Sequence, residues 1–298
     1  MSKKYLDSTK NFLAIAEKGL YEYNTSRVVV QQLPYEYTSS YLQGSSKGPS
    51  AMVAASQFVE LYDEELDLET YQHCGGICTL APLNFKNKVD KKAVEQIRKS
   101  TKQLLLDKKF VVSLGAEHTV TLGLVQAHRE LYPDLCVLQL DAHSDLRLSY
   151  HGNPYSHASV MARIHEEGLS LTQIGIRAQC IEESQMIKES DNIHTFYAHQ
   201  IRRDAQWMKK ALQTLGQNIY LSIDADGFDP SVAPAVGTAE PNGLFWDETL
   251  QFLKLVFEKK NVVGFDIVEV APMKNAILTE YSMAKLAYRL MGYKFCLK

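Results

Sequence analysis

The segment Asp141-Ala-His143-Ser-Asp145 follows directly on the apolar run Leu135–Leu140, which has the composition of a buried β-strand. Three side chains that bind divalent cations therefore lie within five residues, at the point where the strand ends. Such closely spaced polar groups would repel one another and keep their hydration unless a cation held them. The segment predicts a metal site at the carboxyl end of a strand.

A second cluster, in the segment 222–230, has the same relation to the apolar run Asn218–Leu221. Alternation along an extended chain points Asp224 and Asp226 to the same side, so both carboxylates can reach one site. Asp229 falls outside that alternation and lies beside Gly227 and Pro230. We expect Asp229 to cap backbone N–H groups in a turn.

A third contributor is His118, which follows the apolar run Phe110–Val112. Taken singly, each cluster also has a simpler interpretation as a capped turn or a site for one Mg²⁺. Three clusters at strand ends favour a shared site, because open parallel sheets place their sites at that edge. Six mixed imidazole and carboxylate ligands suit two Mn²⁺ ions better than one four-coordinate Zn²⁺: His118, Asp141, His143, Asp145, Asp224 and Asp226.

Strand-like runs and helical stretches alternate along the whole chain. The strand-like runs are 28–32, 77–80, 110–114, 135–140, 171–176, 193–197, 218–223 and 262–268. The helical stretches are 49–61, 91–107, 119–132, 157–167, 181–189, 204–215, 246–259 and 280–291. This alternation predicts an α/β fold with an eight-stranded, mainly parallel sheet, and a closed barrel would give a similar pattern. We expect one domain over residues 1–298, with 1–27 as an N-terminal extension.

The chain resembles the ureohydrolases, the family of arginases and agmatinases, through motifs that occur in the same order. Segments 115–119, 141–145 and 222–230 match the family patterns Gly-Gly-Asp/Glu-His-Ser, Asp-Ala-His-x-Asp and Ser-x-Asp-x-Asp-x-x-Asp-Pro, and segments 233–244 and 264–272 resemble two later motifs. The chain departs from these patterns at Ala116, Thr119, Ala235 and Asn242. The resemblance runs from about Val28 to the C-terminus. It implies an open three-layer α/β/α sandwich and a homo-oligomer, trimer or hexamer.

The resemblance also implies roles for individual residues. One metal would take His118, Asp141, Asp145 and Asp224, and the other Asp141, His143, Asp224 and Asp226. Two cations activate a water at neutral pH, which the unreactive guanidino carbon requires. Asp145 would help to aim that water, Glu269 would pair with the substrate guanidinium, and His157 would carry a proton to the leaving amine.

Three of these side chains also have other interpretations. His151 lies in the same loop as His157 and is its rival as proton carrier, although the run Asn153–Ala158 resembles agmatinases and favours His157. Glu269 could instead form a structural ion pair at a strand end. Arg147 would repel the ammonium of agmatine if it lay in the pocket, and a structural ion pair outside the pocket is the simpler interpretation.

The loop after Asp145 resembles that of agmatinases and lacks the residues that hold arginine's α-groups in arginases. Agmatine, hydrolysed to putrescine and urea, is therefore the first expected substrate. Arginine, aminopropylagmatine and guanidino acids remain open. Two other classes of function also remain: a single-zinc deacetylase, which would not need Asp145 and Asp226, and a non-catalytic regulator, in which loss of ligands would be expected.

Composition bears on partners and compartment. A net charge of −3 without a basic tract argues against nucleic acid or an anionic membrane as a partner. No apolar stretch reaches the roughly 18 residues of a membrane span, and no signal-peptide core follows the N-terminus, so we expect a cytoplasmic enzyme. Five irregularly spaced cysteines fit reduced thiols better than disulfides, and Cys74 with Cys78 lacks a second pair to complete a zinc site.

Overall fold

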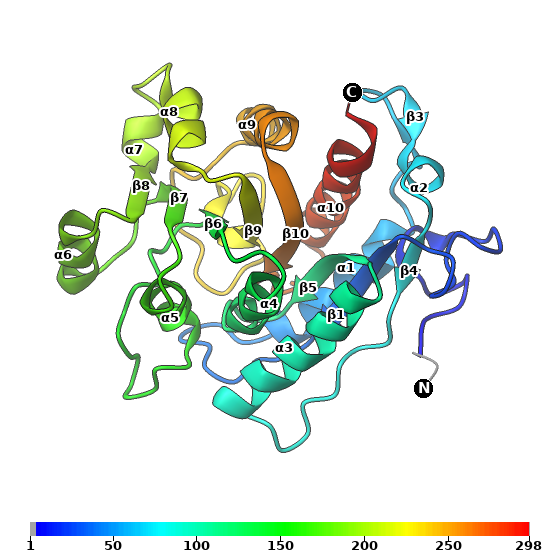
Figure 1. Cartoon of the computed structure of the whole chain (residues 1–298), viewed down its shortest axis with the longest axis horizontal. Coiled ribbons are helices and arrows are strands. Elements are labelled where there is room, and N and C mark those ends of the chain that lie inside the picture. The colour runs from blue at the N-terminus through cyan, green and yellow to red at the C-terminus, as the bar shows by residue number, and fades with distance from the viewer. Residues whose placement is uncertain (1–3, 298) are drawn as a thin grey trace.

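The computed structural model describes residues 4–297, in which eight strands form one sheet with every neighbouring pair parallel. The strand order is β4-β1-β5-β10-β9-β6-β7-β8 (Figure 1). The strands span β1 Val28–Leu33, β4 Ile77–Thr79, β5 Phe110–Gly115, β6 Leu135–Leu140, β7 Leu171–Ile176, β8 Ile193–Tyr197, β9 Asn218–Asp224 and β10 Asn261–Val268. All eight predicted strands are confirmed, and the sheet is open, with β4 and β8 at its edges.

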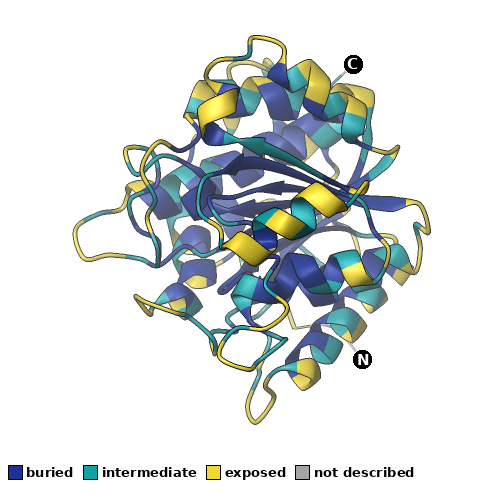
Figure 2. Cartoon of the chain, turned by 90° about the vertical axis from the view of Figure 1, so that its left-hand side faces the viewer, coloured by how far each residue is buried: buried dark blue, intermediate teal, exposed yellow. Residues whose placement is uncertain are grey.

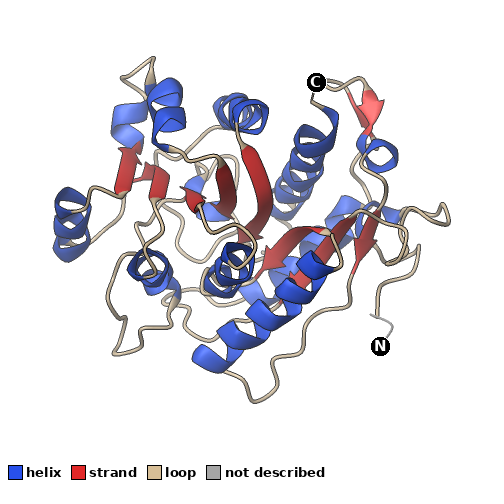
Figure 3. Ribbon diagram, viewed as in Figure 1, coloured by secondary structure: helices blue, strands red, loops and turns tan. Residues whose placement is uncertain are grey.

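Helices cover both faces of the sheet, so the fold is the expected α/β/α sandwich (Figure 3). One face packs against α1, α2 and α7–α10, and the other against α3–α6. The helices span α1 Gly48–Ser56, α2 Thr70–His73, α3 Lys91–Leu106, α4 Val120–Arg129, α5 Val160–Glu166, α6 Ile181–Glu189, α7 Ala198–Ile201, α8 Trp207–Thr214, α9 Trp246–Lys259 and α10 Leu278–Cys296. Short 3₁₀ turns cover η1 Phe12–Ala14, η2 Ser45–Lys47, η3 His157–Ser159 and η4 Ala225–Gly227.

This layering explains why the strands read as continuous apolar runs. In β5, β6 and β7 every residue is buried, because helices exclude water from both sides (Figure 2). The helices are instead amphipathic and turn their polar sides to solvent. Residues before β1 also join the core, since Phe12 and Leu13 are buried in the same cluster as Met52 of α1. No helix in residues 4–297 has the length and apolar character of a membrane span.

Several expected helices are shorter than predicted, as α4 is against the expected 119–132, and α10 is longer than the expected 280–291. The helix expected over 49–61 ends at Ser56, because Phe58 and Val59 form i→i−3 hydrogen bonds that close the last turn. The helix expected over 204–215 begins at Trp207, since Asp204 caps the N–H of Gln206 and holds a turn there. A small antiparallel pair, β2 Tyr62–Asp63 with β3 Leu68–Glu69, was not predicted because such short strands carry no periodic pattern.

The strand order decides where the functional loops meet. Strands β5 and β6 are consecutive in the main sheet along the chain, but β10 and β9 lie between them. The loops that leave the carboxyl ends of β5, β10, β9 and β6 therefore converge at the centre of one sheet edge.

Candidate active site

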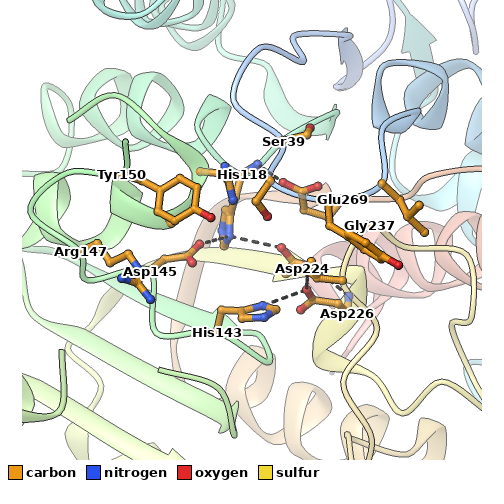
Figure 4. Close-up of a pocket in the computed structure, with 16 residues that line it drawn as sticks. Ser39, His118, His143, Asp145, Arg147, Tyr150, Asp224, Asp226, Gly237 and Glu269 are labelled. Atoms are coloured by element: carbon orange, nitrogen blue, oxygen red, sulfur yellow. Dashed lines mark hydrogen bonds and ion pairs between the residues drawn. The ribbon is translucent and has the colours of Figure 1, made fainter. Parts of the chain in front are cut away.

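All six predicted ligands converge at this edge. Five of them line a cavity of about 150 Å³ (Figure 4), and the sixth, Asp141, lies beside it within 3.1 Å of His118. His118 follows β5, Asp141 follows β6, Asp224 ends β9, and Glu269 follows β10. His143, Asp145 and Asp226 lie on the loops that continue from β6 and β9. Four adjacent parallel strands thus fix the backbone from which the functional side chains project.

His118 lies at the centre of the carboxylates. Its Nδ1 is 2.9 Å from Asp145 Oδ2, 3.1 Å from Asp141 Oδ2 and 3.4 Å from Asp224 Oδ2. This nitrogen is buried and has no hydrogen-bond partner with acceptable geometry in the described part of the chain. A ring nitrogen surrounded by three carboxylate oxygens has the arrangement of a metal ligand beside other ligands.

His143 forms the second half of the cluster. Its Nδ1 lies 3.0 Å from Asp226 Oδ2 and 3.7 Å from Asp141 Oδ1. The ligand atoms of Asp141, His143 and Asp226 lie within 4.8 Å of one another, as do those of His118, Asp141 and Asp224. Asp141 is common to both groups, so two cations held by these groups would share its carboxylate.

The carboxylates strongly perturb one another. Burial, followed by the charges of Asp145 and Asp226, raises the pKa of Asp141 to about 7. Burial and the charge of Asp226 also raise the pKa of Asp224 well above its usual range. Burial alone would lower the pKa of His143, but the charge of Asp226 raises it to about 10. The raised pKa values show that the crowded carboxylates draw protons onto themselves and onto His143, and divalent cations would supply that positive charge instead.

The geometry and chemistry of these donors fit two divalent cations. Nitrogen and carboxylate oxygen donors suit Mn²⁺-like ions, and the unpartnered Nδ1 of His118 faces three of the oxygens. Asp229, by contrast, caps a turn as expected, since it accepts hydrogen bonds from Ser231 N at 3.0 Å and Gly243 N at 3.0 Å. Cys74 and Cys78 are free and buried and belong to no metal-binding group in the described residues.

A buried hydrogen-bond network that the motifs did not predict orients His118. Its Nε2 donates to Ser222 Oγ at 2.9 Å, and Ser222 donates in turn to Asp266 Oδ1 at 2.8 Å. Asp266 also accepts hydrogen bonds from Tyr220 at 2.9 Å and from Thr121 at 3.0 Å. This network directs Nδ1 of His118 toward the carboxylates, as outer-sphere partners commonly do for metal-binding histidines.

The loop that carries Asp226 is held by close packing and by a buried arginine. A Cβ on Gly227 would lie 2.7 Å from Asp141 N, so only glycine fits between the two ligand loops. Arg177 donates to the carbonyls of Asp226 at 2.6 Å and Glu240 at 2.9 Å, which joins this loop to the 240s loop. The sequence could not predict this role of Arg177, because its partners are backbone carbonyls, which every residue has.

Glu269 lies in the cavity wall with one oxygen occupied, since Oε1 accepts a hydrogen bond from His118 N at 2.8 Å. Burial and the charge of Glu117 raise the pKa of Glu269 well above its usual range. No lysine or arginine in the described chain forms an ion pair with Glu269. Its side chain therefore does not form the structural ion pair that was the alternative interpretation.

The structure separates the two loop histidines. His157 lies in the cavity wall, whereas His151 is exposed and stacks edge-on against Tyr150 outside it. Burial lowers the pKa of His157. Arg147 also lines the cavity, yet its Nε lies 4.0 Å from Glu183 and its guanidinium lies over the ring of Tyr150. The sequence offered two alternatives for Arg147, a place in the pocket or a structural ion pair. In the structure Arg147 both lines the cavity and lies near Glu183.

Comparisons with known proteins identify the family. The Arginase family model matches residues 26–292. The N(1)-aminopropylagmatine ureohydrolase of Synechocystis is 41% identical over 296 residues, covering 97% of this chain and 95% of that protein, and the Agmatinase of Halalkalibacterium halodurans is 33% identical, covering 84% and 86%. The crystal structure of agmatine ureohydrolase of Thermoplasma volcanium superimposes with a TM-score of 0.81 at 27% identity, over 96% of this chain and 94% of that one.

The family match spans all three ligand loops and the strands that position them. Arginase-family enzymes depend on a binuclear metal centre, and the two clusters that share Asp141 are suited to hold one. The chain belongs to the arginase family and is a ureohydrolase.

Proposed function

We propose that this enzyme uses two Mn²⁺ ions to hydrolyse a linear guanidino polyamine to urea and an amine, with N¹-aminopropylagmatine preferred and agmatine second. Water adds its oxygen to the guanidino carbon, the bond from that carbon to the alkyl nitrogen breaks, and the amine leaves with a proton. The observation that supports this proposal is that six candidate metal ligands gather at one cavity. Beside them lies the Glu269 carboxylate, which forms no ion pair with a lysine or arginine of residues 4–297.

The two ligand sets are those that the family resemblance implies, and the distances support most of their members. His118, Asp141, Asp145 and Asp224 would hold one ion. Asp141, His143 and Asp226 would hold the other, with Asp224 added by the resemblance alone. When bound, two such cations supply a water nucleophile at neutral pH, because they lower the pKa of bound water by many units from about 15.7. Asp145 would accept a hydrogen bond from that water and aim it.

Glu269 would bind the guanidinium of the substrate. Its Oε1 is oriented by His118 N, which leaves Oε2 available to the cavity. A planar guanidinium forms short, charge-assisted hydrogen bonds with a carboxylate, and the cavity excludes most of the competing water. This contact would hold the guanidino carbon beside the metal ligands.

His157 would transfer the proton to the leaving amine. An alkyl amine is a poor leaving group unless it is protonated as the carbon–nitrogen bond breaks. His157 lies in the wall of the cavity, while His151 is exposed and lies outside it. The position of the two rings therefore supports the choice made from the sequence.

The relatives support the longer substrate. Four relatives that are 35–41% identical to this chain are named N(1)-aminopropylagmatine ureohydrolase, whereas the agmatinases among these relatives are 31–34% identical. The motifs alone favoured agmatine, because agmatine and aminopropylagmatine share the guanidinobutyl part that the motifs contact. With aminopropylagmatine the products are urea and spermidine.

The entrance to the cavity suits a polyamine chain. Tyr41 and Leu42 are exposed and line the cavity, and Tyr150 lines it too, with the Arg147 guanidinium over its ring. Aromatic faces attract ammonium groups, and methylene groups pack on apolar rims. Glu183 lies 4.0 Å from Arg147, so its negative charge partly offsets the positive charge of Arg147. The repulsion between Arg147 and a substrate ammonium is weaker as a result.

Steady-state urea release in Mn²⁺ tests the proposal with aminopropylagmatine, agmatine, arginine and 4-guanidinobutyrate. We expect kcat/KM to fall in the order in which these substrates are named. An α-carboxylate among acidic side chains, faced only by Arg147 whose charge Glu183 partly offsets, costs roughly 1–3 kcal/mol, which corresponds to about 5- to 150-fold discrimination against arginine. Arg147→Ala should weaken 4-guanidinobutyrate further without weakening agmatine.

Each outcome has a defined meaning. A higher kcat/KM for arginine or guanidinobutyrate than for either polyamine would refute the substrate class but retain the ureohydrolase chemistry. Absence of urea from every compound would refute the proposal as a whole. The trimer or hexamer and the cytoplasmic location expected from the sequence stay predictions, which light scattering and cell fractionation can check.

A further inference from the structure

Thr38 connects a buried carboxylate to the proposed proton carrier. Its hydroxyl donates to Glu117 Oε1 at 3.0 Å. The same oxygen lies 3.1 Å from His157 Nδ1 and accepts a hydrogen bond from His157 N at 3.1 Å. Glu117 is completely buried, so the contact takes place away from bulk water.

The hydrogen-bonding capacity of a hydroxyl then fixes the proton on His157. A threonine hydroxyl has one proton to donate and two lone pairs that accept. Glu117 takes the proton of Thr38, and His157 N–H takes one lone pair. The remaining lone pair faces Nδ1, so Nδ1 must carry a proton to form a hydrogen bond. In neutral His157 the unprotonated nitrogen is therefore Nε2.

Glu117 is held in a single orientation by the backbone. Its Oε2 accepts hydrogen bonds from Tyr37 N at 2.7 Å and Thr38 N at 2.6 Å. Within residues 4–297, Oε1 accepts a side-chain hydrogen bond from Thr38 Oγ1 and from no other side chain. The ring of His157 also packs edge-on against Tyr150 at 5.6 Å, which limits its rotation.

We propose that Glu117 and Thr38 are positioning residues that hold His157 as its Nδ1–H tautomer, with Nε2 available to the cavity for proton transfer. The relay rests on the proposed role of His157. It resembles other acid–base sites, in which a second group orients the histidine that moves the proton. Glu117 lies next to the metal ligand His118, so one short segment would serve the metal centre and the proton carrier together.

Three single variants test the relay. Thr38→Val keeps the shape but removes the hydroxyl, and we expect kcat to fall about 10- to 100-fold with KM changed less than about threefold. Thr38→Ser keeps the hydroxyl and should retain kcat within about threefold. Thr25→Val, which removes an exposed hydroxyl distant from the cavity, is the matched control and should be unchanged.

Glu117→Gln separates the tautomer from the position of the loop. Tyr37 N and Thr38 N need an acceptor, so the amide oxygen should occupy the Oε2 position and the amide NH₂ the Oε1 position. Thr38 would then accept from the amide and donate to His157 Nδ1, which reverses the tautomer. We expect kcat to fall at least about tenfold while both backbone hydrogen bonds persist.

Two readouts decide the matter. In protein with ¹⁵N-labelled histidine and diamagnetic Mg²⁺, NMR should show neutral His157 protonated at Nδ1 in the wild type and at Nε2 in Glu117→Gln. In a double-mutant cycle, Thr38→Val should lower kcat by less than about twofold when His157 is already Asn, because the relay acts through that ring. Metal content measured on every variant should stay at the wild-type value.

The outcomes are distinguishable. An Nε2–H tautomer in the wild type, or an equal loss from Thr38→Val in both backgrounds, would refute the relay. If His157→Asn alone left kcat unchanged, the assignment of His157 as proton carrier would be wrong and the relay would have no catalytic role. If Thr38→Val did not fold, the NMR comparison with Glu117→Gln would still decide the tautomer.

Discussion

Protonation of the buried His128 should make the fold sensitive to mild acid. Its Nδ1 donates to Leu124 O at 2.8 Å, while Nε2 is buried without a partner in the described residues. Burial lowers the pKa of His128 to about 4. A histidine with a depressed folded-state pKa stabilises the fold above its unfolded value of about 6.5, and this stability is lost as pH falls toward 4. Between pH 7 and pH 5 the wild type should lose about 2 kcal/mol from this one group.

The substitution His128→Leu removes the titrating group and should reduce the acid sensitivity by that amount. The measurement is denaturant-induced unfolding of both proteins at pH 7 and pH 5. A cavity left by leucine changes the free energy of unfolding equally at both pH values. The change in this free energy between pH 7 and pH 5 is therefore compared between the two proteins, and the difference is due to His128. Metal ligands titrate equally in the two proteins and also cancel. Equal acid sensitivity of the two proteins would show that His128 does not stay neutral in the fold.

The site makes three further predictions. Asp226→Ala should lower the Mn²⁺ content measured by mass spectrometry from about two to about one per chain and abolish most urea release, and one bound zinc with unchanged activity would exclude the binuclear centre. His157→Asn should lower kcat roughly 10²- to 10⁴-fold with both metals retained, whereas His151→Asn should be mild, and the reverse ranking in steady-state kinetics would move the proton carrier to His151. Gly227→Ala should push the loop away from Asp141, costing about 1–3 kcal/mol in thermal or denaturant unfolding and weakening metal retention on dialysis, and an unchanged protein would show that the two loops are not in close contact.

The sheet was predictable because each strand carries its own signal. Residues 110–115 and 135–140 are apolar throughout, since both faces are covered, and they end where polar residues begin. The residues proposed as metal ligands could be selected for the same reason, because most of them are close neighbours in the sequence as well as in the fold. The strand order, in which β10 and β9 separate β5 from β6, is not visible in any local pattern. The family resemblance implied the sandwich but did not give this order from the residues.

The positioning residues were missed because their partners are distant in sequence and unremarkable in composition. Thr38 meets His157 across 119 residues, and Ser222 meets Asp266 across 44. Ser222 and Asp266 do lie within two of the motifs, so a question about their role could have been raised there. Thr38 is one of many loop hydroxyls, and only the fold distinguishes it. Local patterns thus reveal groups that act on the ligand, while tertiary structure reveals groups that act through them.

The concentration of negative charge at the site explains why the candidate ligands follow the buried central strands of the sheet. Asp141, Asp224 and Asp226 are buried close together, and burial of unpaired charge costs several kcal/mol per group. The pKa of Asp141 near 7 means that without cations the cluster holds protons in their place. Cation binding must therefore release protons, and its free energy adds to that of folding. The strands beside these side chains also form the hydrophobic core. The stability of the core offsets the repulsion between the buried carboxylates. A site on mobile loops would relax in response to the repulsion between the carboxylates and lose the geometry that suits two divalent cations.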